Sequence, residues 1–266
     1  MLFVVAVTTV FGSKNKSSGG SDTNAITVVL SFLSTDNTQV ILISKPIADT
    51  AKSQVKIKWS ENSRVFSMKE ISRGYLVFTD TISPTPLISY TIELNSNLGN
   101  SIGSITLPES TAITAPQAKD TLPLGEPVNF NWTSAQGAGY YNVRCYAYAY
   151  NDSGYNSCPE QQFYPTSNAI TIPVSYFNVP GTTYYDVYLS VTPCSGTIPQ
   201  AGQTENMTGA IKGFMMAEGN CSSVEFYVGT PPTKGATKEE FVDRTPPRKD
   251  RINAYLNDLG IKKVVK

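Results

Sequence analysis

The side chains best placed to do chemistry in this chain are its cysteines, because the chain contains no histidine at all. Histidine supplies most general bases and many zinc ligands, so its absence excludes Ser-His-Asp and Cys-His hydrolysis. The four cysteines also lack the closely spaced Cys-x-x-Cys pairs typical of zinc sites. We therefore predict no catalytic, cofactor-binding or metal-binding residue, and we do not expect an enzyme.

An even number of cysteines in an exported chain favours disulfides over free thiols. The four lie at Cys145, Cys158, Cys194 and Cys221, and three pairings are formally possible. We favour the local one, in which Cys145–Cys158 closes a hairpin at 151–154 and Cys194–Cys221 clips an insertion at 202–219. Each bridge would stabilise the fold by about 2–4 kcal/mol and would imply an oxidising, extracytoplasmic compartment.

Tyrosine is the least ordinary surface feature, with 15 residues in the chain. After Cys145, tyrosine alternates strictly with alanine, and in a later run two tyrosines alternate with the apolar residues that face the core. Because successive side chains of a strand point to opposite faces, both patterns predict outward-facing rings, at Tyr146, Tyr148, Tyr150, Tyr184 and Tyr188. If the two strands are neighbours, these rings form one exposed platform. Such a platform suits a protein contact or sugar stacking, while the plainer alternative is cross-strand pairing on a half-buried sheet.

The strands that must position these rings follow from apolar alternation. Val128, Phe130 and Trp132 alternate, Tyr141 and Val143 continue after a short polar link, and a further run spans 185–191. Each run offers one apolar face to a shared core, so residues 111–230 should form a β-sandwich. The order of these motifs resembles a fibronectin type III module.

The resemblance to fibronectin type III implies roles for two of these aromatic residues. Trp132 would lie on the second strand and pack in the core. Tyr185 would lie near the start of the penultimate strand and make a corner hydrogen bond. Both would then be structural residues. No Arg-Gly-Asp tripeptide occurs, so the integrin-binding activity found in that family is not carried over.

Residues 24–110 predict a first β-sandwich. Short apolar runs near 26–30, 40–43, 55–59, 75–78, 90–94 and 105–107 are separated by polar turns, a pattern typical of an immunoglobulin-like sandwich. A proline-containing stretch at 108–127 would act as a short stiff connector. We therefore expect an all-β protein with two tandem antiparallel sandwiches, immunoglobulin-like and then fibronectin type III-like.

The two ends of the chain depart from this pattern. Residues 1–12 are apolar but too short for a membrane-spanning helix, so they indicate either an export signal without its basic region or a β-strand. Residues 13–23 are rich in Gly and Ser and predict a flexible tether. In the tail, 231–266, helical spacing predicts a short amphipathic helix over 248–259. That helix would pack on its own sandwich, dock on a neighbouring subunit or anchor in the cell envelope.

Charge limits the partners. The 21 basic and 21 acidic residues balance, and Lys and Arg gather only near the C-terminus, which argues against nucleic acid and against a membrane surface beyond the export segment. We expect no cofactor. The leading hypothesis is a non-catalytic secreted or cell-surface structural or adhesive protein, acting by protein contacts or by self-assembly, as in a filament. The alternative is a carbohydrate-binding accessory module that uses the tyrosines.

Overall fold

A computed structural model describes residues 38–44, 54–65, 67–72, 75–82, 84–96, 99–151, 154–198, 203–210 and 215–231. The predicted segments at 1–12, 13–23 and 248–259 lie outside these ranges. Within them the chain is built of strands and one short 3-10 turn, η2 (Val174–Phe177), so the predicted all-β class is confirmed. No helix in the described part is long and apolar enough to cross a membrane.

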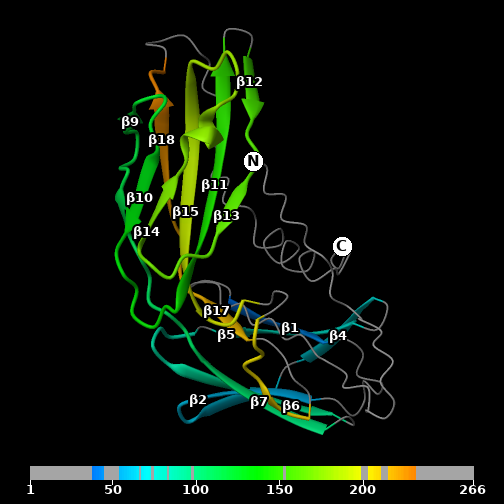
Figure 1. Cartoon of the computed structure of the whole chain (residues 1–266). Coiled ribbons are helices and arrows are strands. Elements are labelled where there is room, and N and C mark those ends of the chain that lie inside the picture. Colours follow the sequence, from blue (N-terminus) through cyan, green and yellow to red (C-terminus); the bar gives the residue numbers. More distant parts are fainter. Residues whose placement is uncertain are drawn as a thin grey trace, which may run out of the picture.

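The second half of the chain forms two sheets (Figure 1). The smaller has the order β14-β10-β8, with bounds Ala169–Ile172, Val128–Trp132 and Ile113–Ala115. The larger has the order β12-β11-β15-β18-β9, with bounds Gly154–Ser157, Tyr140–Asn151, Tyr184–Gly196, Ser222–Gly229 and Thr121–Leu122. Two short strands extend it: β13 (Gln161–Phe163) on β11 and β17 (Met216–Glu218) on β15.

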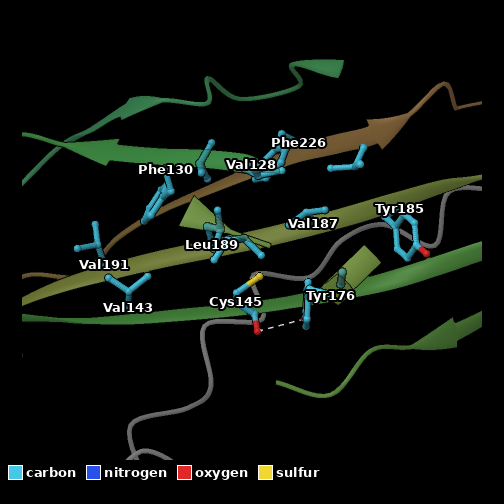
Figure 2. Close-up of a cluster of buried hydrophobic side chains, with 14 of the residues drawn as sticks. Val128, Phe130, Val143, Cys145, Tyr176, Tyr185, Val187, Leu189, Val191 and Phe226 are labelled. Atoms are coloured by element: carbon cyan, nitrogen blue, oxygen red, sulfur yellow. Dashed lines mark hydrogen bonds between the residues drawn. The ribbon is translucent and has the colours of Figure 1, made fainter. Parts of the chain in front are cut away.

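These two sheets share one core, which makes the second half a β-sandwich. Phe130 of the small sheet is packed in a cluster with Val143, Val187 and Phe226 of the large sheet, and all four side chains are fully buried (Figure 2). The Tyr176 hydroxyl of η2 lies in the same cluster and donates a hydrogen bond of 3.3 Å to the Cys145 carbonyl. The alternating apolar runs of the sequence are thus the inward faces of strands from opposite sheets.

The two residues singled out by the fibronectin type III resemblance have the expected roles. Trp132, on β10, is buried in the core. Tyr185, at the start of β15, is also buried, and its hydroxyl accepts a hydrogen bond of 2.9 Å from the Val179 amide. This local arrangement is the tyrosine corner of such sandwiches, and the fibronectin type III-like fold is confirmed.

Two more tyrosines make the same kind of contact. The Tyr141 hydroxyl accepts from the Ala135 amide at 2.9 Å, and the Tyr90 hydroxyl accepts from the Thr85 amide at 2.7 Å. In each case a large ring enters the core and its hydroxyl satisfies an amide of the loop before the strand. The tyrosine content of the chain therefore serves the core as well as the surface.

The first half also contains two sheets, which Figure 1 shows as two layers. One has the order β1-β5-β4, with bounds Thr38–Ser44, Tyr75–Ile82 and Ser67–Ser72. The other has the order β16-β7-β6-β2-β3, with bounds Thr208–Gly209, Gly99–Thr106, Ser89–Ser96, Gln54–Trp59 and Asn62–Val65. The runs predicted near 40, 55, 75 and 90 are strands, whereas β3 and β4 were not predicted. The last strand, β7, begins six residues before the predicted Ile105.

One strand of this second sheet comes from the other half of the chain. After β15 the chain crosses to the first half, where Thr208 and Gly209 pair with Ile102 and Ser101 of β7, and it then returns to β15 as β17. Met207 and Met215 are buried beside Gly103, where a Cβ atom would stand only 2.2 Å from the Met215 sulfur. The predicted insertion at 202–219 is therefore a clasp between the two halves.

Candidate functional site

The candidate site is the outward face of β11 and β15. These strands pair in an antiparallel register that sets Tyr146 opposite Tyr188 and Tyr150 opposite Tyr184. The tyrosines expected to face outward therefore lie together on one face of the large sheet. We call this surface the tyrosine face and define it as Tyr146, Tyr148, Tyr150, Tyr155, Tyr184, Asp186 and Tyr188.

Cross-strand neighbours on this face stack on one another. The ring centroids of Tyr146 and Tyr188 are 4.8 Å apart with the planes inclined by 22°, and those of Tyr150 and Tyr184 are 4.6 Å apart at 5°. These separations match the spacing of about 4.7–4.9 Å between paired strands. The rings therefore stand up from the sheet side by side, with their faces turned toward each other rather than toward solvent.

Tyr155 extends the tyrosine face and was not foreseen from the sequence. It lies on β12 opposite Tyr150, and its ring contacts those of Tyr148 and Tyr150 at centroid distances of 5.5 and 5.7 Å. The alternation that marks the other tyrosines stops at the 151–154 turn, so only the hairpin register shows which way this ring points. The ring of Tyr148 also makes an edge contact with the ring of Tyr146, at a centroid distance of 6.3 Å.

Exposure varies across the face, and this corrects the expectation of a uniformly exposed platform. Tyr188 and Tyr184, on the central strand, are only 6% and 8% exposed. The β11 tyrosines of this face, Tyr146, Tyr148 and Tyr150, are half-buried, and Tyr155 is 54% exposed. The more exposed part of the face therefore lies toward β11 and β12.

An acidic residue occupies the middle of the tyrosine face. Asp186 is opposite Tyr148 of β11 and, on its other side, opposite Tyr227 of β18, while Tyr184 and Tyr188 flank it along its own strand. The pKa of Tyr150 is raised chiefly by burial, then by the Asp186 charge and by a hydrogen bond between the two side chains. Burial and the same carboxylate raise the pKa of Tyr184. These phenols stay protonated as hydrogen-bond donors.

The next outward position on β11 carries the positive charge of this face. Arg144 is 8% exposed and lies opposite Ser190, and one guanidinium nitrogen is 3.7 Å from a Glu160 carboxylate oxygen. Beyond it, the Gln162 side-chain amide donates a hydrogen bond of 2.8 Å to the side-chain oxygen Oδ1 of Asn142. The face thus changes from a tyrosine end to a polar end along the length of the strands.

The cysteines do not form the predicted disulfides in this structure, since all four are free thiols. The favoured pairs are nevertheless neighbours. Cys158 donates its amide to Ala147, two residues from Cys145 on β11, and Cys194 and Cys221 lie close enough to influence each other electrostatically. Burial raises the pKa of Cys145 to about 12 and that of Cys194 well above its usual value. Such thiols are poor nucleophiles, because the thiolate is the reactive form.

No set of three or more His, Cys, Asp or Glu side chains gathers as a metal site among the residues that the structure describes. The face offers aromatic edges, phenol hydroxyls and one central carboxylate, which are groups that can bind a partner.

Comparison with known proteins gives distant likenesses. No protein-family model matches the chain. No curated protein matches it either. The FN1–FN3 domains of chicken CNTN1 align with 13% identity and a TM-score of 0.25, over 74% of this chain and 64% of that one. The fibronectin(III)-like modules of Clostridium thermocellum CbhA align with 10% identity and a TM-score of 0.26, over 79% and 96%.

Proposed function

We propose that this chain is a non-catalytic structural or adhesive protein that works outside the cytoplasm and binds a protein partner through its tyrosine face. Its two halves act as tandem sandwich modules, immunoglobulin-like and then fibronectin type III-like, held together by the clasp. The low content of charged residues, 16%, and the even number of cysteines support an extracytoplasmic setting.

The stacking of the tyrosines is the observation that favours a protein over a glycan. A sugar ring binds an aromatic platform by lying flat on an exposed ring face. Here the faces of Tyr146 and Tyr150 are turned to Tyr188 and Tyr184 at 4.8 and 4.6 Å, so ring edges and hydroxyls point outward. Edges and hydroxyls of closely packed tyrosines suit a protein contact, in which a few large side chains supply most of the binding energy.

The experiment that tests this proposal places a photo-crosslinking residue on the tyrosine face. Tyr155→benzoylphenylalanine puts the probe at the accessible end of the tyrosine face, and Val65→benzoylphenylalanine puts it on β3 of the other half, where Val65 is 48% exposed. In an extract of the native source, we expect a discrete protein adduct from position 155 and none from position 65.

A glycan array with the unmodified chain provides the competing result. Binding to a polysaccharide that the substitution Tyr148→Ser abolishes, with no protein adduct at position 155, would establish the carbohydrate-binding alternative. Equal adducts from both probe positions would mean that the tyrosine face has no special role.

A further inference from the structure

Ring contacts join the tyrosines of this face into one continuous line. Five contacts among the described residues, at centroid distances from 4.6 to 6.3 Å, connect six rings in the order Tyr188, Tyr146, Tyr148, Tyr155, Tyr150 and Tyr184. The two end rings both belong to β15, whereas Tyr155 belongs to β12. The line therefore consists of two arms that start on the central strand and meet at Tyr155.

The exposure of the rings changes in the same direction along both arms. Tyr188 and Tyr184, where the arms start, are buried, and Tyr155, where the arms meet, is exposed. The β11 rings between them are half-buried. Each arm thus leads, through rings in contact, from a buried phenol to one that water can reach.

This arrangement suits the transfer of single electrons. Tyrosine rings are among the side chains that lose one electron most readily, and electrons pass between aromatic rings in contact. An oxidised phenol is a cation until its hydroxyl proton leaves, and a buried charge costs free energy. Burial, and then the Asp186 charge, raise the pKa of Tyr150 and of Tyr184, so these hydroxyls hold their protons. At Tyr155 water can accept the proton.

We propose that this line of tyrosines carries one-electron oxidation from the buried rings of β15 to Tyr155 at the surface. A one-electron oxidant, such as a high-valent metal complex, takes an electron from Tyr188 or Tyr184 and is reduced by it. Each oxidised ring is then restored by an electron from the next ring along the arm. Tyr155 gives the last electron, releases its hydroxyl proton to water and becomes a neutral phenoxyl radical.

The consequence for the protein is that the buried rings are restored and the radical stands where a soluble reductant can return one electron and one proton. This inference does not depend on the proposed function, because it needs no partner protein.

The test is flash photolysis of the full chain with a photo-oxidant attached at one end of the line. Ser223 is exposed on β18 and lies opposite Ser190, two residues from Tyr188. Ser223→azidophenylalanine accepts an alkyne-bearing ruthenium tris-bipyridyl complex without use of the cysteines. Light and a sacrificial electron acceptor convert Ru(II) to Ru(III), which takes one electron from a nearby ring. The spin trap 2-methyl-2-nitrosopropane then bonds to the tyrosyl radical, and peptide mapping identifies the residue.

The sheet places Tyr155 far from the attached complex. Ser223 is level with Arg144 of β11, through Ser190, whereas Tyr155 is level with Tyr150. Strand spacings of about 4.8 Å and a rise of about 3.3 Å per residue put the two backbones about 25 Å apart. A direct reaction over this distance is slow, so a rapid adduct on Tyr155 has to arise through the rings between.

We expect the adduct on Tyr155, and we expect Tyr148→Phe to abolish it. The arm from Tyr188 passes through ring 148, and phenylalanine is not oxidised by Ru(III). Tyr150→Phe is the matched control: it makes the same change on the other arm and should keep the adduct. Both substitutions keep the aromatic ring, and thermal unfolding checks that each variant folds.

Three results would overturn the proposal. One is an undiminished Tyr155 adduct in Tyr148→Phe. Another is an adduct that stays on Tyr188 or Tyr150 when no other residue is changed. The third is an equal Tyr155 adduct when the complex is attached at Val65, on β3 of the other half, where no adduct is expected. All three are measured on the isolated chain, so they do not depend on whether the crosslinking experiment finds a partner.

Discussion

Three tyrosine hydroxyls accept a hydrogen bond from a loop amide, and these amides differ in burial. The cost of removing each hydroxyl should therefore follow the burial of its amide. The change is Tyr→Phe at positions 141, 185 and 90, which keeps the ring in the core and removes only the hydroxyl. The amide partners are those of Ala135, which is buried, Val179, which is half-buried, and Thr85, which is exposed.

The expected cost follows from what each amide can bind afterwards. A buried amide without an acceptor costs about 1–3 kcal/mol, whereas an amide that water can reach loses only the net worth of a hydrogen bond, about 0.5–1.5 kcal/mol. We therefore expect about 2 kcal/mol for Tyr141→Phe, about 1–1.5 kcal/mol for Tyr185→Phe and less than about 1 kcal/mol for Tyr90→Phe.

Urea unfolding measures this series, with a tryptophan reporting on each half of the chain. Trp132 is 5.3 Å from Tyr141 by ring centroids, and Trp59 is 6.0 Å from Tyr90. Amide hydrogen exchange at Ala135 and Val179 should accelerate only in the variant that removes the matching hydroxyl. Tyr155→Phe, at an exposed ring, is the control. A control as costly as Tyr141→Phe, or a larger cost at Tyr90 than at Tyr141, would refute the reasoning.

Three other outcomes follow from the same geometry. In the reduced chain, burial raises the pKa of Cys145 from 9.0 to about 12, so this thiol ionises at a lower pH in the unfolded chain than in the folded one. The stability of the reduced chain should therefore fall as the pH rises from 9 to about 12, and Cys145→Ala should reduce that fall in pH-dependent unfolding. Intact mass with and without reductant, followed by peptide mapping of protein from its native source, should find Cys145–Cys158 and Cys194–Cys221; a Cys145–Cys194 bridge would contradict this pairing. Gly209→Ala should release the clasp, since its Cβ would stand 2.3 Å from the Asn100 carbonyl oxygen, and limited proteolysis should then cut near 203–210, while Gly139→Ala, with no atom within 4 Å, should not.

The alternation of side chains along a strand explains how much of the fold could be predicted from the sequence. The alternation around Phe130, Val143 and Val187 depends only on successive side chains taking opposite faces, so the sandwich core and the outward tyrosines follow directly from it. The clasp does not follow, because Thr208 and Gly209 form a two-residue strand with no apolar period. The position of the clasp depends on contacts between the small residue Gly103 and buried methionines that are distant from it in sequence.

The site shows the same division between what is local and what depends on pairing. Parity assigns Tyr146 and Tyr188 to outward positions, but only the register sets one ring against the other and leaves Tyr148 facing Asp186. A shift of the register by two residues would keep every side chain on its face. It would also give Tyr148 a tyrosine partner and set Asp186 opposite Tyr146 or Tyr150. The stacked ring pairs of the tyrosine face thus depend on pairing that alternation alone cannot reveal, and this is why a sequence that predicts aromatic rings on a surface does not by itself choose between a sugar and a protein.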